Sequence, residues 1–145
     1  MFYDRKDFIR AEKYFNYAAN TRENFMFVNR INSVAREYMG RLCERQGKLA
    51  EAYHWYELAA EDYNNQKMKL KMADANFYGD GVPRDIQQAL NYYSEAAQYK
   101  THEYFFEAQN KLAWIYELGE FVDKDLTKAD EYWEKLPPEC KPARA

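Results

Sequence analysis

The hydrophobic positions of this chain recur at helical spacing. Around Ala89, apolar side chains stand three positions before it and four and seven positions after it. At about 3.6 residues per turn, these offsets lie on one face of a helix. The sequence lacks the alternating apolar and polar runs that mark half-buried strands, so the pattern predicts an all-α chain.

The same pattern occurs four times along the chain, which predicts a repeat protein. In each copy an apolar residue precedes an alanine by three positions, and an aromatic pair begins three positions after that alanine. Successive alanines are 41, 37 and 40 residues apart. The marker alanines are Ala11, Ala52, Ala89 and Ala129, and the aromatic pairs are Tyr14-Phe15, Trp55-Tyr56, Tyr92-Tyr93 and Tyr132-Trp133.

The marked segments and the stretches between them predict about seven helices in one domain, residues 1–136. The marked segments, called B helices, are expected at about 5–20, 48–63, 85–98 and 125–136. The intervening A helices are expected at about 24–45, 65–78 and 104–118. Pro137-Pro138 stops the last helix, and 137–145 is expected to be a disordered tail.

Turn and capping residues mark where the B helices begin. Gly79-Asp80-Gly81 supplies residues that tolerate positive φ. Asp85 and Gln88 have the spacing of a capping box, and an aspartate at a helix start also favours the positive end of the helix dipole. Asp125 stands at the corresponding place in the next copy.

These residues resemble a known repeat family. The motif Met72-Ala73-x-x-Asn76-x-x-Gly79-x-Gly81-Val82-x-x-Asp85-x-x-Gln88-Ala89-x-x-Tyr92-Tyr93-x-x-Ala96-Ala97 is similar to the Sel1-like repeat. A second copy runs from Ala108 to Trp133. The unit from Met39 to Ala59 has a shorter turn and is closer to a tetratricopeptide repeat.

The resemblance implies a right-handed α-solenoid of stacked antiparallel helix pairs, with the A helices lining a concave wall. Two residues depart from the family pattern, because Asn76 replaces a large core residue and Phe121 replaces the second turn glycine. The chain starts and ends on B helices without an obvious polar capping helix. The ends are therefore covered by irregular segments, by a partner, by self-association or by further repeats of a longer array.

Composition narrows the functional classes. The net charge of −3 argues against a general nucleic-acid binder, although residues 1–47 carry +3 and residues 48–145 carry −6. Cys43 and Cys140 make no disulfide framework, which favours a reducing compartment. No apolar run is long enough for a membrane span, and the start lacks the apolar core of a signal peptide. We expect a cytoplasmic protein, or a periplasmic or secreted one if a leader was removed.

The sequence offers no catalytic constellation. His54 and His102 are 48 residues apart, and neither has other ligands at metal-binding spacing. Cys43 occupies a core position of its repeat and has no visible activating base. We therefore predict a non-enzymatic protein without a metal or cofactor.

A partner-binding surface is the remaining expectation. Helical periodicity selects the A-helix residues that point away from the B helices, and large aromatics among them are frequent binding hot spots. For Trp114 and Phe77 the alternative is a core position, since a register error of one residue would bury either ring. The candidate residues are Glu37, Arg41, Arg45, Lys67, Leu70, Asp74, Phe77, Glu107, Asn110, Trp114 and Glu117.

The leading hypothesis is a protein-interaction module that binds another protein or peptide through this wall. The resemblance implies an adaptor, a regulator, or a bacterial immunity protein that neutralises a toxin. The alternatives are an enzyme accessory or a glycan- or peptidoglycan-associated factor, since tyrosine and tryptophan stack on sugars, and a fragment of a longer scaffold array.

Overall fold

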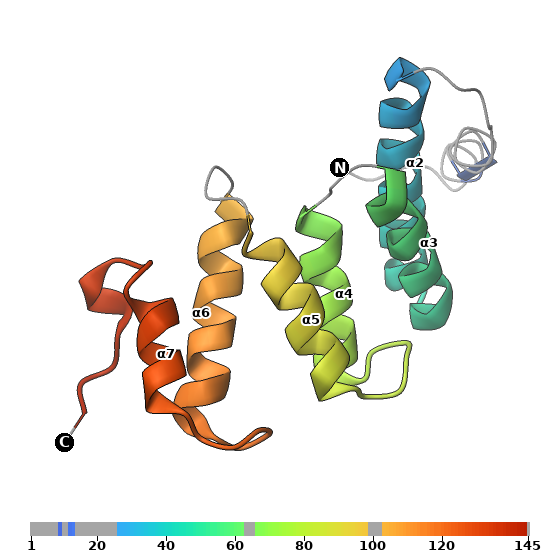
Figure 1. Ribbon diagram of the computed structural model, residues 1–145. Helices are drawn as coiled ribbons and strands as arrows, with labels where there is room; N and C mark the ends of the chain where they lie inside the picture. Colours follow the sequence, from blue (N-terminus) through green and yellow to red (C-terminus); the bar gives the residue numbers. More distant parts are fainter. Residues whose placement is uncertain (1–8, 10–11, 14–25, 63–65, 99–102, 145) are drawn as a thin grey trace.

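The computed structural model describes residues 9, 12–13, 26–62, 66–98 and 103–144 (Figure 1). Within these residues the chain forms six α-helices, one short 3-10 turn and no strand. The helices are α2 (Met26–Arg45), α3 (Leu49–Asp62), α4 (Gln66–Tyr78), α5 (Ile86–Ala96), α6 (Glu103–Leu118) and α7 (Leu126–Trp133), and the turn is η1 (Pro138–Cys140).

The helices pack as successive pairs, which confirms the predicted α-solenoid. The pairs α2–α3, α4–α5 and α6–α7 follow one another from right to left in Figure 1, and each pair packs on the next. The structure begins and ends these helices within three residues of the predicted bounds. The helix expected at about 5–20 lies outside the described residues, apart from residues 9 and 12–13.

The marker alanines lie where the paired helices meet. Ala52, Ala89 and Ala129 are at most 2% exposed, because their small side chains let the partner helix approach closely. The second aromatic residue of each described pair fills the space beside the alanine: Tyr56, Tyr93 and Trp133 are at most 4% exposed. The first aromatic residue of each pair is only partly buried. The repeated pattern in the sequence is therefore the core of the array.

Two aspartates begin the helices α5 and α7 as the sequence predicts, but only the aspartate half of the predicted Asp85–Gln88 capping box forms, because the Asp85 N–H donates to the Asn76 carbonyl. The Asp85 carboxylate accepts a hydrogen bond from the Gln88 amide at 3.0 Å, and Asp125 accepts one from the Lys128 amide at 2.9 Å. Each aspartate also donates its own backbone N–H to a carbonyl of the preceding A helix. The cap therefore satisfies a free helix donor and ties the turn to its own repeat.

Glycine is required where two repeats touch. Gly81 has a φ of +81°, and a Cβ atom there would lie 2.3 Å from the carbonyl oxygen of Leu49. Only glycine allows the turn before α5 to rest on the start of α3. Gly40 has a similar role within the first pair, because a Cβ would lie 2.4 Å from the buried ring of Tyr56.

Asn76, which departs from the family pattern, is accommodated by hydrogen bonds. Its side chain is buried, and its amide donates to the Tyr53 hydroxyl at 3.1 Å and to the Met72 carbonyl at 2.8 Å. Burial raises the pKa of Tyr53 to about 12, so its hydroxyl stays neutral. The amide thus replaces apolar packing with a polar link between α4 and α3.

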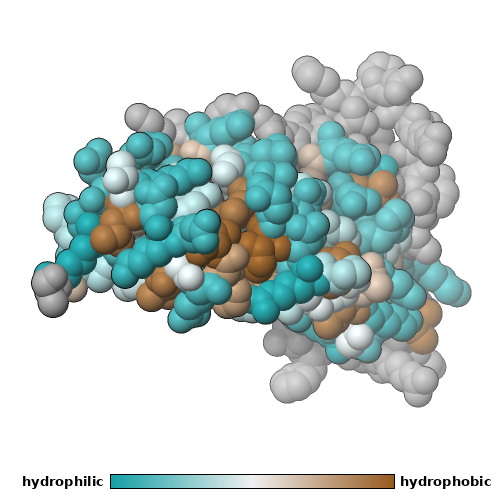
Figure 2. Space-filling view, turned by 60° about the horizontal axis from the view of Figure 1, so that its bottom comes forward, coloured by the Kyte–Doolittle hydropathy of each residue, from teal (hydrophilic) through white to brown (hydrophobic). Residues whose placement is uncertain are grey.

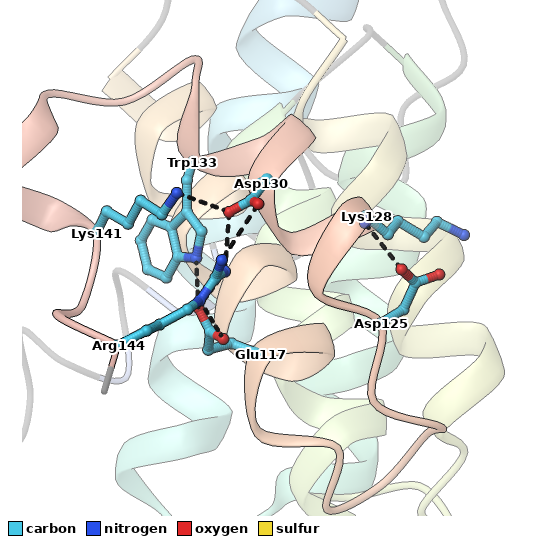
Figure 3. Close-up of polar contacts among 7 residues, drawn as sticks. All are labelled: Glu117, Asp125, Lys128, Asp130, Trp133, Lys141 and Arg144. Atoms are coloured by element: carbon cyan, nitrogen blue, oxygen red, sulfur yellow. Dashed lines mark hydrogen bonds and ion pairs between the residues drawn. The ribbon is translucent and has the colours of Figure 1, made fainter.

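The residues that follow α7 return to α6 and α7 (Figure 3), whereas the sequence predicts a disordered tail. Arg144 contacts Glu117 of α6 at 2.7 Å and Asp130 of α7 at 2.8 Å, and Lys141 also pairs with Asp130 at 2.8 Å. The Trp133 indole donates to the same Glu117 carboxylate at 3.2 Å. We call this group, Glu117, Asp130, Trp133, Lys141 and Arg144, the C-terminal clasp. Ion pairs therefore place the C-terminal residues against α6 and α7, which the composition of this segment alone does not predict.

The clasp changes the acidity of its carboxyl groups. Hydrogen bonds from Arg144 and then Lys141 lower the pKa of Asp130 to about 2, from an ordinary 3.8. Arg144, and after it the Trp133 indole, also lowers the pKa of Glu117. Because these pKa values are lower in the folded chain, the clasp stabilises the fold at neutral pH and loses its effect as acid protonates both groups.

The helix-pair contact predicts the effect of overpacking. Ala89→Leu adds three carbon atoms at a site with no exposed surface, so it should lower the free energy of unfolding by about 1–3 kcal/mol. Chemical denaturation measures this change. Ala50→Leu, at an exposed position of α3, is the matched control and should change stability little. An unchanged stability for Ala89→Leu would contradict the helix register.

The clasp predicts a pH-dependent loss of stability. Arg144→Ala should lower the melting temperature near neutral pH, and the difference from wild type should shrink as the pH falls from about 5 toward 2. Thermal melts followed by circular dichroism across this range test it. Arg45→Ala, which removes an exposed arginine at the end of α2, should show no such dependence. A difference that does not shrink between pH 5 and pH 2 would exclude the carboxylates as its cause.

Candidate partner-binding surface

The first helices of the three described pairs lie next to one another, and we call their shared face the A-helix wall. Ion pairs join these helices. Lys67 of α4 pairs with Glu37 of α2, Lys71 pairs with Glu44 at 3.4 Å, and Lys111 of α6 lies 4.0 Å from Asp74. Exposed pairs of this kind contribute little stability individually. They do mean that much of the charge on the wall is already matched within the chain.

Asp74 connects the wall to the core. The buried Tyr93 hydroxyl of α5 donates a hydrogen bond to its carboxylate. Burial, and then the neighbouring Asp74 carboxylate, raise the pKa of Tyr93, so the hydroxyl remains a donor at neutral pH. A core aromatic thereby fixes the position of an acidic side chain on the binding face.

A cavity of about 540 Å³ opens between α3, α4 and the start of α6, and we call it the acidic cavity. Four carboxylates and two lysines line it. The lysines, Lys67 and Lys71, already pair with Glu37 and Glu44. No ion pair within the described residues involves Asp80 or Glu107. The carboxylates of the lining are Glu44, Asp74, Asp80 and Glu107.

Tyr56 brings a buried polar group to the acidic cavity. Its side chain is only 4% exposed, and its hydroxyl lies close to the Glu44 carboxylate. Burial, and next the nearby Glu44 carboxylate, raise its pKa, so the neutral phenol both accepts and donates. The hydroxyl therefore keeps its proton beside Glu44, and Tyr56 adds no charge to the lining of the acidic cavity.

A second cavity, of about 320 Å³, lies between the C-terminal ends of α4 and α6, and we call it the aromatic pocket. Its rim carries large side chains, all exposed except the partly buried Phe77, and the buried Tyr93 and Ile115 form part of its lining. Lys111 is the charged residue of the lining. The large rim residues are Phe77, Tyr78, Trp114, Leu118 and Phe121.

Figure 2 turns this end of the molecule forward. It shows brown hydrophobic atoms gathered near the middle of the face and framed by teal hydrophilic atoms. Tyr78, Leu118 and Phe121 are 57%, 55% and 43% exposed. An apolar group bordered by polar residues is typical of an interaction site.

Phe121 shapes the aromatic pocket. Its ring packs edge-on against Phe77 of α4, with ring centres 5.0 Å apart. The Arg84 guanidinium lies over both rings, at 4.4 Å from Phe121 and 5.8 Å from Phe77. The departure from the family's turn glycine therefore creates an aromatic contact between two repeats and one side of the pocket.

The structure distributes the predicted binding residues over four places: α2, the acidic cavity, the aromatic pocket and, for Glu117, the C-terminal clasp. Arg45 is exposed at the end of α2, and Arg41 pairs with Glu37 at 2.9 Å. The residues at the acidic cavity are Lys67, Leu70, Asp74 and Glu107, and those at the aromatic pocket are Phe77, Asn110 and Trp114.

The predicted exposure of two candidates is wrong. Leu70 is 5% exposed and belongs to the core cluster that contains Ala108 and Leu112 of α6, because α6 packs directly on this side of α4. Glu117 is 8% exposed, because Trp133 and Arg144 cover it in the C-terminal clasp.

Trp114 and Phe77 combine the two roles that the sequence left open. Trp114 is 37% exposed at the aromatic pocket, while its ring meets Trp133 edge-on with centres 5.3 Å apart. Phe77 is partly buried against the core and also lines the pocket. Each ring therefore packs on one side and leaves another side to the pocket.

Sequence reasoning missed several residues of the surface. Tyr78 and Leu118 each stand just before a turn glycine, where helical periodicity no longer assigns a face. In the sequence Phe121 is only a departure from the repeat, although a large apolar residue in place of a turn glycine is itself a signal. The sequence does not single out Lys111, because its place on this surface depends on contacts with Tyr78 and Asp74 that only the fold brings about.

The described residues offer little support for a metal site or for a reactive thiol. No group of three or more potential metal ligands occurs among the described residues. Cys43 is buried, and burial raises the pKa of its thiol, whereas Cys140 is exposed. None of the described helices is long and apolar enough to cross a membrane.

Comparison with known proteins identifies the repeat. The Sel1 repeat matches residues 3–20, 34–64, 69–98 and 106–136. Curated proteins gave no match. Proteins with Sel1 repeats are generally protein-interaction modules.

Two solved structures share the fold. The crystal structure of c5321, described as a protective antigen present in uropathogenic Escherichia coli strains and displaying an SLR fold, is 26% identical with a TM-score of 0.61. A Sel1 repeat protein from Oxalobacter formigenes is 23% identical with a TM-score of 0.65. The matches cover 76% and 90% of this chain, which spans only 24% and 52% of those chains.

The helix pairs, the capped B helices and the four matched regions agree with one another, and the chain belongs to the Sel1 repeat family.

Proposed function

We propose that this chain is a non-enzymatic module that binds a partner protein through its A-helix wall, as an adaptor or regulator. The observation that carries the proposal is the aromatic pocket, where exposed rings from α4, α6 and the turn after α6 surround a cavity. Tryptophan and tyrosine are enriched among the residues that dominate protein interfaces.

The remaining wall supports a protein partner rather than a small substrate. The two cavities lie along the wall and are joined by the Lys111–Asp74 pair. A surface with two separate recognition points suits an extended segment or a helix of another protein.

A toxin-neutralising role is the second candidate. Its support is the charge of residues 48–145, a net of −6, which would favour association with a basic protein. Co-expression with a basic toxin encoded beside the chain's own gene would test this role, since growth should be rescued only when the chain is present. The adaptor or regulator role does not depend on that outcome.

The aromatic pocket predicts that replacing Trp114 affects partner binding far more than the stability of the fold. Trp114→Ala should abolish capture of the partner from a lysate of the source organism, measured by affinity purification and mass spectrometry. It should lower the free energy of unfolding by only about 1–2 kcal/mol, because the ring is partly exposed, whereas a fully buried tryptophan would cost about 3–5 kcal/mol.

Phe106→Ala is the matched control for this experiment. Phe106 is also on α6, is 49% exposed and packs edge-on against its neighbour Phe105, but it does not line the aromatic pocket. The Phe106 variant should capture the same partner as wild type. Equal capture by wild type and the Trp114 variant would remove the aromatic pocket from the proposal.

A further inference from the structure

The chemistry of the two cavities indicates what kind of partner segment the A-helix wall accepts. The acidic cavity offers carboxylates of which two, on Asp80 and Glu107, form no ion pair among the described residues. The aromatic pocket offers apolar rings and a single charged side chain, Lys111. The two cavities therefore favour different groups.

The acidic cavity suits a positively charged hydrogen-bond donor. Four carboxylates against two lysines give its lining an excess of negative charge. Tyr56, which lines the same cavity beside Glu44, stays neutral and leaves this excess of negative charge unchanged. A lysine ammonium or an arginine guanidinium carries both the charge and the donors that this lining lacks.

The aromatic pocket suits a large apolar side chain. Its rim of Phe77, Tyr78, Trp114, Leu118 and Phe121 lines a cavity of about 320 Å³. Lys111 at its edge already interacts with the Tyr78 ring and hydroxyl and lies 4.0 Å from Asp74. This position leaves the apolar surface to exclude water from a docked side chain.

The cavities adjoin along α4 and α6. Asp74 lines the acidic cavity and Lys111 lines the aromatic pocket, and their charged groups are 4.0 Å apart. One short segment of a partner can therefore reach both sites at once. Joining two weak contacts in one chain raises the affinity and requires both side chains together.

We propose that the A-helix wall binds a protein segment carrying a basic side chain, which enters the acidic cavity, and a large apolar side chain, which enters the aromatic pocket. This proposal rests on the proposed function and adds the chemistry of the partner. The source of specificity is the combination, because neither an acidic protein nor a purely apolar segment satisfies both cavities.

Selection from a random peptide library displayed on phage tests the proposal. The purified wild-type chain is the bait, and peptides that also bind the Trp114→Ala variant are removed. The expected result is a motif with an aromatic or large aliphatic residue and a lysine or arginine at a fixed spacing. A synthetic peptide of that motif should then lose roughly tenfold in affinity for Glu107→Lys and for Asp80→Lys, measured by calorimetry.

Charge reversal in the peptide provides the decisive control. Replacing its basic residue by glutamate should weaken binding to wild type and restore binding to Glu107→Lys. Glu131→Lys, the same reversal at an exposed position of α7 away from both cavities, should bind the original peptide as wild type does. Circular dichroism melts establish that each variant is folded.

The outcomes separate this inference from the proposed function. Selected peptides that need Trp114 but contain no basic residue, or that bind Glu107→Lys and Asp80→Lys as tightly as wild type, would overturn the basic-partner inference alone. A library that yields no peptide dependent on Trp114 would overturn the proposed binding surface and this inference with it.

Discussion

The structure depends on close contact between paired helices at the marker alanines. Ala89 and Tyr93 of α5 have no exposed surface, and neither has Ala73 of α4, which lies in the same cluster. Small side chains bring the helix axes together, and the aromatic ring fills the space that remains beside them. Every described pair repeats this contact. The same packing therefore forms the core of each pair, and side chains outside it can differ from one repeat to the next.

The same core aromatic also organises the candidate binding face. Tyr93 is completely buried, yet its hydroxyl reaches Asp74, which lies 4.0 Å from Lys111 of the next repeat. A core tyrosine of α5 thus fixes the position of an acidic side chain on the face formed by α4 and α6. This connection explains how a regular scaffold can hold side chains on its wall in a defined arrangement.

The candidate site develops where the chain departs from its own repeat. Phe121 replaces a turn glycine, and its ring packs against Phe77 beneath the Arg84 guanidinium. Asn76 replaces a large apolar residue and forms hydrogen bonds instead. Family membership therefore accounts for the scaffold, while the individual chemistry of the wall belongs to residues that the shared pattern does not specify.

The sequence by itself determined the helices, their order and the core register, because the 3.6-residue period, the small alanines, the turn glycines and the aspartate caps act locally and recur in each copy. Only the tertiary structure decided which wall residues are available. The packing of α6 on α4 buries Leu70, and Arg144 returns from the C-terminal residues to cover Glu117. Tyr78, Leu118 and Phe121 come together from separate segments around one pocket. Such contacts join residues that lie far apart in the chain, so no local period encodes them.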